Sequence, residues 1–101
     1  MPISVKHLPE STTILLTGEV DHHGARSMMA QVEEAISALL PMRLTLDLSG
    51  VTFMDSSGIA VLLRAHRQVS RHGGTLEVRA IPAQPRRVLD AAGVGRIITL
   101  K

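Results

Sequence analysis

The chain has 101 residues, enough for one domain with a hydrophobic core but with little to spare for a separate catalytic module. Phe53 is its only aromatic residue. The absence of cysteine excludes disulfides and thiolate metal sites, and no run resembles a membrane span or a signal peptide. Residues 1–50 carry three basic and six acidic side chains, whereas residues 51–101 carry eight and three; the arginines are dispersed and lack stacking aromatics, which argues against nucleic-acid binding. We expect one cytoplasmic domain over residues 1–101, with an aliphatic core and no association with membranes.

The first part of the chain predicts a β-hairpin and then a helix. Two strand-like runs, residues 3–8 and 13–20, are separated by Pro9-Glu10-Ser11, a composition typical of tight turns. Apolar residues then recur at steps of three and four over residues 24–40, with polar residues between them, which predicts an amphipathic helix. Asp21 precedes this helix and suits its N-cap position.

The middle of the chain, residues 44–63, has the most informative pattern. Leucines alternate with polar residues over residues 44–48, which predicts a half-buried strand that ends at Ser49-Gly50. After the polar run Asp55-Ser56-Ser57-Gly58 the period becomes helical, and we expect a helix over residues 57–72. The predicted apolar stripe of this helix is Ile59, Leu62, Leu63, His66 and Val69.

The last part of the chain predicts a strand at residues 75–80, a short helix with Pro85 in its first turn, and a final strand at residues 97–100. The complete order is then β-β-α-β-α-β-α-β. We therefore expect an α/β fold with a small mixed, mostly parallel β-sheet whose crossover helices pack on one side. The initial hairpin supplies the one antiparallel neighbour.

Two hydroxyl groups, those of Ser56 and Ser57, lie where the second helix is predicted to begin. Free backbone N–H groups and the helix dipole both favour negative charge at such a position. A serine there caps the helix or accepts a phosphate, and the residue chemistry alone leaves both interpretations open. Gly58 favours the second, because a residue without a side chain lets another protein's active site close over the hydroxyl.

Other chemistries fit the sequence poorly. The serines lack the glycine two positions earlier that a nucleophile elbow uses, and no glycine-rich phosphate loop with lysine is present. In a helix, the adjacent side chains of His22 and His23 would point about 100° apart, so they could not share one metal ion. We expect neither an enzyme nor a metal site.

Residues 46–59 resemble the core motif of STAS domains, and more narrowly that of bacterial anti-sigma factor antagonists of the sporulation and stress-response type. Residues 18–23, Gly-Glu-Val-Asp-His-His, resemble the first functional loop of this family, and residues 87–94 resemble its terminal helix. The resemblance thus spans almost the whole chain. One departure is Ala60, which stands where many members have glycine.

The resemblance implies a protein switch without a cofactor of its own. The unphosphorylated antagonist would bind an anti-sigma factor, a serine kinase of the GHKL type that holds ATP or ADP, and thereby release a sigma factor. The kinase would phosphorylate Ser57 and end the complex, and a serine phosphatase would reset it. The expected partner-binding residues are Asp21, His22, His23, Asp55, Ser56, Gly58 and Val61, the last because it lies off the predicted apolar stripe.

Two alternatives from other classes remain at this stage. The same domain could be a non-phosphorylated STAS subunit of a transporter or a signalling assembly. It could also be a small-ligand sensor, although an aliphatic core with one phenylalanine offers no evident pocket.

Overall fold

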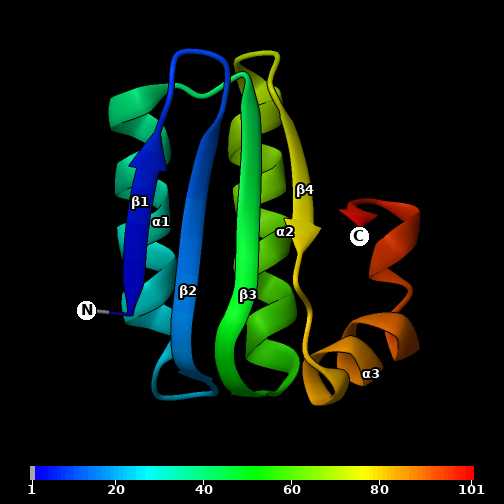
Figure 1. The fold of residues 1–101 in the computed structure, drawn as a ribbon. Helices are drawn as coiled ribbons and strands as arrows, with labels where there is room; N and C mark the ends of the chain where they lie inside the picture. The colour runs from blue at the N-terminus through cyan, green and yellow to red at the C-terminus, as the bar shows by residue number, and fades with distance from the viewer. Residues whose placement is uncertain (1) are drawn as a thin grey trace.

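The computed structural model of the protein has five strands in one sheet, in the order β1-β2-β3-β4-β5 (Figure 1). The strands are β1 (Ile3–His7), β2 (Thr12–Val20), β3 (Arg43–Met54), β4 (Thr75–Arg79) and β5 (Thr99–Leu100). The helices are α1 (Ala25–Leu39), α2 (Ser56–Arg71), α3 (Ala83–Ala91) and the short 3-10 helix η1 (Val94–Arg96). The structure describes residues 2–101, so Met1 of the predicted domain lies outside it.

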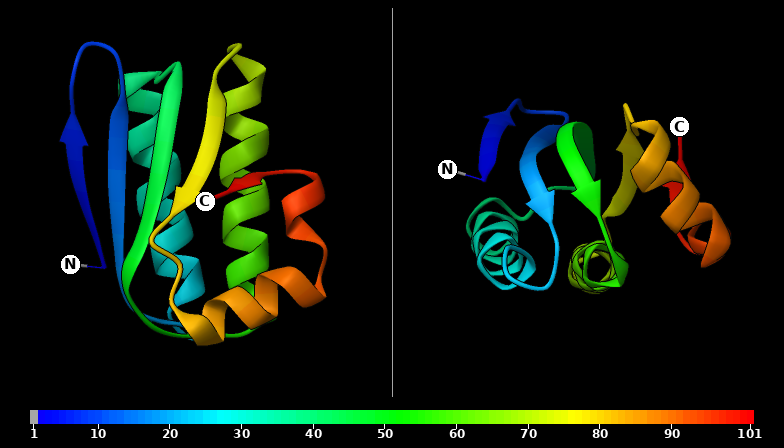
Figure 2. Two further views of the ribbon diagram at one scale, coloured as in Figure 1. Left: turned by 45° about the vertical axis from the view of Figure 1, so that its right-hand side comes forward. Right: turned by 90° about the horizontal axis from the view of Figure 1, so that it is seen from below.

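The strand pairing confirms the predicted fold class. β1 pairs antiparallel with β2, and the β2–β3, β3–β4 and β4–β5 pairs are all parallel. α1 and α2 lie side by side against one face of the sheet, while α3 lies beyond β4 (Figure 2). Among residues 2–101, no helix covers the other face, and none is long and apolar enough to cross a membrane.

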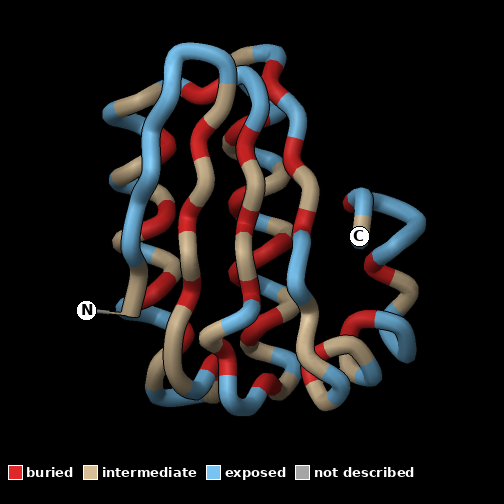
Figure 3. Tube along the Cα trace, in the orientation of Figure 1, coloured by how far each residue is buried: buried red, intermediate tan, exposed pale blue. Residues whose placement is uncertain are grey.

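The core between the sheet and the two long helices is aliphatic, as predicted. Figure 3 shows where the buried positions lie along the chain. Alternate residues of β2 and β3 are buried there, and α1 contributes Met28, Val32 and Ile36 to the same cluster. Phe53 is 43% exposed and stays outside the core. Burial of aliphatic side chains is therefore what holds α1 and α2 onto the sheet.

The predicted strand end at Ser49-Gly50 is wrong, because β3 continues through it to Met54. Against β2, the register advances from Leu15–Asp47 to Thr17–Gly50, so that three steps of β3 match two of β2. A second shift of the same kind follows Val51. These are β-bulges, which insert a residue without ending a strand. A Cβ added at Gly50 would lie 2.7 Å from Cγ2 of Thr17, so glycine permits this close approach.

The predicted stripe of α2 is displaced around the helix. The buried residues are Gly58, Val61, Leu62, Ala65 and Val69, whereas Ile59, Leu63 and His66 are half-buried. Val61 is only 1% exposed, so the expectation that it contacts a partner is wrong. Gly58 is buried as well, and a Cβ added there would overlap the side chain of Met54. Its role is close packing of α2 on β3, which corrects the expectation that it makes room for a partner.

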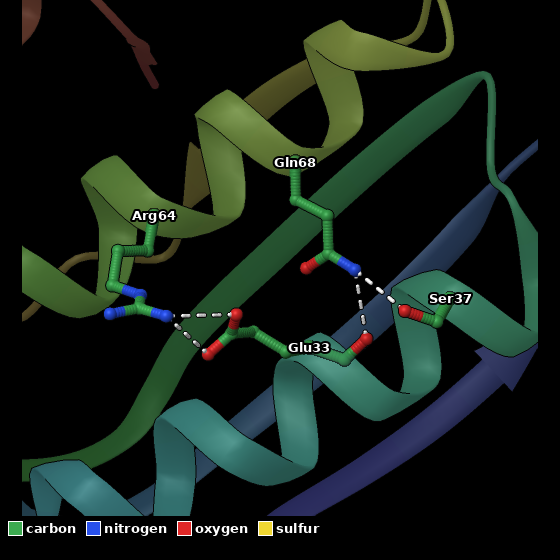
Figure 4. A network of polar contacts seen from close by, with 4 residues as sticks. All are labelled: Glu33, Ser37, Arg64 and Gln68. Atoms are coloured by element: carbon green, nitrogen blue, oxygen red, sulfur yellow. Dashed lines mark hydrogen bonds and ion pairs between the residues drawn. The ribbon is translucent and has the colours of Figure 1, made fainter.

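Polar contacts fix α2 against α1 on the solvent side of the core (Figure 4). A guanidinium nitrogen of Arg64 lies 3.1 Å from Oε2 of Glu33. The side-chain amide of Gln68 donates to the Glu33 carbonyl at 3.0 Å and to the Ser37 hydroxyl at 2.9 Å. The two helices therefore form one layer against the sheet.

Candidate functional site

Two loops meet at the edge of the sheet where β2 and β3 end, at the bottom of Figure 1. The two strands are parallel, and their last residues, Val20 and Met54, are register partners. An aspartate follows each strand directly: Asp21 after β2 and Asp55 after β3. The topology thus brings both parts of the predicted site to one edge.

Asp55 is the residue that joins the two loops. It is the N-cap of α2, and its Oδ1 accepts the N–H of Ser57 at 2.7 Å. Its Oδ2 accepts the backbone N–H of His22, in the other loop, at 3.2 Å. Asp55 therefore stabilises the helix start and holds the first loop beside it.

The Asp55 cap changes the interpretation of the two serines. A capping serine was one of the two predicted alternatives, and it is wrong because a carboxylate holds that position. Neither the Ser56 nor the Ser57 hydroxyl makes a hydrogen bond within residues 2–101. Ser56 is exposed and Ser57 is half-buried. Both hydroxyls are thus available at the N-terminus of a 16-residue helix.

Asp21 organises the first loop in a different way. Its Oδ1 accepts the backbone N–H groups of Gly24 at 2.8 Å and His23 at 3.0 Å, within a turn that leads into α1. Chiefly because of the hydrogen bond from Gly24, the pKa of Asp21 lies below its ordinary value. The N-cap of α1 itself is Gly24, which has no capping side chain. The prediction of an N-cap at Asp21 is therefore wrong, because the N-cap lies about one turn later, at Gly24.

The two histidines of the first loop are exposed. The ring centroids of His22 and His23 lie 5.5 Å apart in an edge-on arrangement. Within residues 2–101, no group of three or more potential ligand side chains is placed to hold a metal ion. The two rings therefore add exposed hydrogen-bonding groups next to the acidic side chains of Asp21 and Asp55.

One residue that contacts this edge was missed from the sequence. Gln84, in the first turn of α3, donates from Nε2 to the Met54 carbonyl at 2.7 Å and accepts the Met54 N–H at 2.8 Å. Met54 is the residue immediately before Asp55. A single glutamine thirty positions away gives no local pattern, so only the folded chain reveals the contact.

The sequence profile of the family described as "Mlab, STAS domain" matches residues 3–100. An "Anti-sigma F factor antagonist" of Paenibacillus polymyxa is 30% identical over 100 residues, which cover 99% of this chain and 86% of that protein. The chain belongs to the STAS domain family. The predicted resemblance to this family is therefore confirmed.

Solved STAS structures have the same fold. The crystal structure of an anti-sigma factor antagonist from Mycobacterium paratuberculosis matches with a TM-score of 0.86 and 22% identity, over 97% of this chain and 82% of that one. The anti-sigma factor antagonist SpoIIAA in its unphosphorylated form matches with a TM-score of 0.80 and 23% identity, over 98% and 87% of the two chains. At these identities the likeness concerns the fold.

Proposed function

We propose that this STAS domain is an anti-sigma factor antagonist that works as a protein switch and is not itself an enzyme. Its unphosphorylated form binds an anti-sigma factor serine kinase of the GHKL type and so frees a sigma factor in the cytoplasm. Phosphorylation of Ser57 ends that binding, and a serine phosphatase restores it. The names of the curated relatives, which include "Anti-sigma F factor antagonist" and "Anti-sigma-B factor antagonist", support the general assignment.

The observation that supports the switch is that the Ser57 hydroxyl makes no hydrogen bond within residues 2–101. Asp55 already caps α2, so the helix does not need this hydroxyl for its own stability. The group lies on the first turn of a helix, where the backbone dipole favours an added phosphate. Ser57 can therefore change its charge while the fold stays intact.

The same phosphate would oppose binding to a partner. It brings about −1.5 to −2 charges to a helix start that already holds the carboxylate of Asp55. Asp21 contributes a second carboxylate in the adjacent loop. A partner that covers this edge would have to remove water from a strongly hydrated anion. Phosphorylation thus weakens the complex through the interface itself.

The proposed contact surface consists of the exposed and half-exposed groups around Ser57. It comprises Asp21, His22, His23, Asp55 and Ser56, all of which lie on or next to the two joined loops. Ala60, one turn further along α2, is exposed beside them. The kinase supplies the ATP, so the antagonist needs no cofactor of its own.

The test is the intact mass of the protein after incubation with the cognate kinase and ATP. The parent protein and Ser56→Ala should each gain one phosphate, and Ser57→Ala should gain none. A phosphate on Ser57→Ala together with none on Ser56→Ala would move the site to Ser56. No phosphate on any of the three would contradict the switch and favour the non-phosphorylated subunit.

A further inference from the structure

Within residues 2–101, the last part of β3 pairs with a neighbouring strand on one side only. β4 pairs with β3 only as far as Asp47 and Arg79, and the chain then turns away into α3. β3 itself continues for seven more residues, to Met54. The backbone N–H of Asp55 donates to the Val20 carbonyl of β2. Successive residues of a strand point their backbone groups to opposite sides, so the N–H and C=O of Met54 face the side where β4 has turned away.

The side chain of Gln84 occupies that vacant place. Its amide donates to the Met54 carbonyl at 2.7 Å and accepts the Met54 N–H at 2.8 Å. A primary amide has the donor and the acceptor of a peptide group, so one side chain replaces one residue of a strand. Met54 is buried, and its backbone groups would otherwise lack these partners.

Met54 in turn supports the start of α2 by two routes. Its side chain fills the space that a side chain at Gly58 would need, directly beneath the first turn of the helix. Its backbone leads into Asp55, whose carboxylate holds the N–H of Ser57. Gln84 is therefore linked to Ser57 through Met54 and Asp55, although it does not touch Ser57.

We propose that Gln84 is a positioning residue for the phosphorylation of Ser57. This inference rests on the proposed function and adds α3 to the parts of the molecule on which the switch depends. A kinase must place the hydroxyl oxygen in line with the phosphate that it transfers, and a displacement of about 1 Å can cost about 100-fold in rate. By fixing Met54, Gln84 limits the movement of the helix start that carries this hydroxyl.

The experiment compares Gln84→Met with a matched control, Gln68→Met. Both changes replace a glutamine side chain that makes two hydrogen bonds to another element, but Gln68 bonds α1 and lies away from the site. Two quantities are measured: hydrogen exchange of the Met54 amide by NMR, which needs no partner, and the kcat and KM of the kinase for each variant.

In Gln84→Met we expect the Met54 amide to exchange about tenfold faster or more and kcat to fall about tenfold, with KM nearly unchanged. Gln68→Met should leave both quantities as in the parent. Unchanged exchange at Met54 would overturn the proposed hold on β3, and faster exchange with an unchanged kcat would overturn its importance for phosphorylation. If the parent protein itself accepts no phosphate, the proposed function fails as well, and the exchange data still decide whether Gln84 holds Met54.

Discussion

The two strand–helix junctions of the site each place an aspartate directly after the strand, but the two carboxylates bond different backbone groups. After β2, Asp21 accepts the N–H groups of its own loop, and α1 begins one turn later without a capping side chain. After β3, Asp55 caps α2 directly and also binds the first loop through the N–H of His22. The first aspartate serves its own turn, whereas the second holds two segments.

The Asp55 cap explains why neither serine hydroxyl at the β3–α2 junction is needed to cap the helix. The β3–α2 junction has an aspartate in the capping position and two hydroxyls behind it, so it satisfies the helix start without using either serine. A modification of Ser57 then leaves the cap untouched. Because Asp55 caps the helix and Ser57 does not, the proposed phosphorylation of Ser57 would be compatible with an intact α2.

The largest expected effect comes from a substitution that disrupts the sheet, on which the position of both junctions depends. Leu46 is fully buried in β3, between register partners Ile14 of β2 and Val78 of β4. Leu46→Asp would bury an unpaired charge at a cost of several kcal/mol, enough to unfold a domain of ordinary stability. Thermal unfolding, followed by circular dichroism, measures the loss of stability. Ser49→Asp, at an exposed position of the same strand, is the control, and an unchanged melting curve for Leu46→Asp would contradict the fold.

A second, smaller effect separates the two aspartates. Asp55→Ala removes the cap of α2 and the bond to His22, and we expect the free energy of unfolding to fall by about 1–2 kcal/mol. Chemical denaturation measures the change. Asp55→Asn should recover most of it, because asparagine also caps helices. Equal stability of Asp55→Ala and the parent would show that the junctions do not differ as described.

A third prediction concerns the charge of Asp21. Its pKa is lowered in the folded protein, so the carboxylate stabilises the fold above its ordinary pKa of 3.8, and this contribution is lost as the pH falls through the lowered value. The melting temperature of Asp21→Asn should therefore be slightly lower than that of the parent at pH 7, and the two melting temperatures should be equal at strongly acid pH. Melting temperatures across this range test the sign, and a difference that grows toward acid pH would contradict it.

The same variant tests partner contact. Asp21→Asn keeps a side-chain oxygen that can accept the N–H groups of His23 and Gly24 but removes the negative charge, so weaker binding to the kinase would indicate a contact at Asp21. Affinity for the kinase is measured by calorimetry. Binding as tight as that of the parent would leave Asp21 with a structural role alone.

The smallest effect is expected at the serines themselves. Ser56→Ala and Ser57→Ala should each change the free energy of unfolding by less than about 0.5 kcal/mol, because neither hydroxyl has a partner within residues 2–101. Denaturation curves that overlay that of the parent would agree with this account. A loss near that of Asp55→Ala would mean that a serine stabilises the helix start after all.

The sequence predicted the elements well because their periodicities are local. The alternation of leucines identified β3, and the three- and four-residue steps identified α1. The bulge at Gly50 was missed because a glycine that breaks a strand and a glycine that lets a neighbour approach look alike in one dimension.

The errors at the site have a different origin. The stripe of α2 was placed by its large apolar residues, but small Gly58 and Ala65 face the sheet and let the helix lie close, which also buries Val61. Gln84 could not be found at all, because its contact joins segments thirty residues apart. The assignment of Ser57 as the phosphorylated residue stays a prediction from the family resemblance and from its position at the start of α2.

The central claim is that one phosphate on Ser57 controls binding without changing the fold. Its most direct test is isothermal titration of the kinase in its ADP form with unphosphorylated protein and with protein phosphorylated on Ser57. We expect the phosphorylated form to bind at least tenfold more weakly, a difference of about 1.4 kcal/mol, while both forms unfold at nearly the same temperature. Equal affinities for the two forms would contradict the switch.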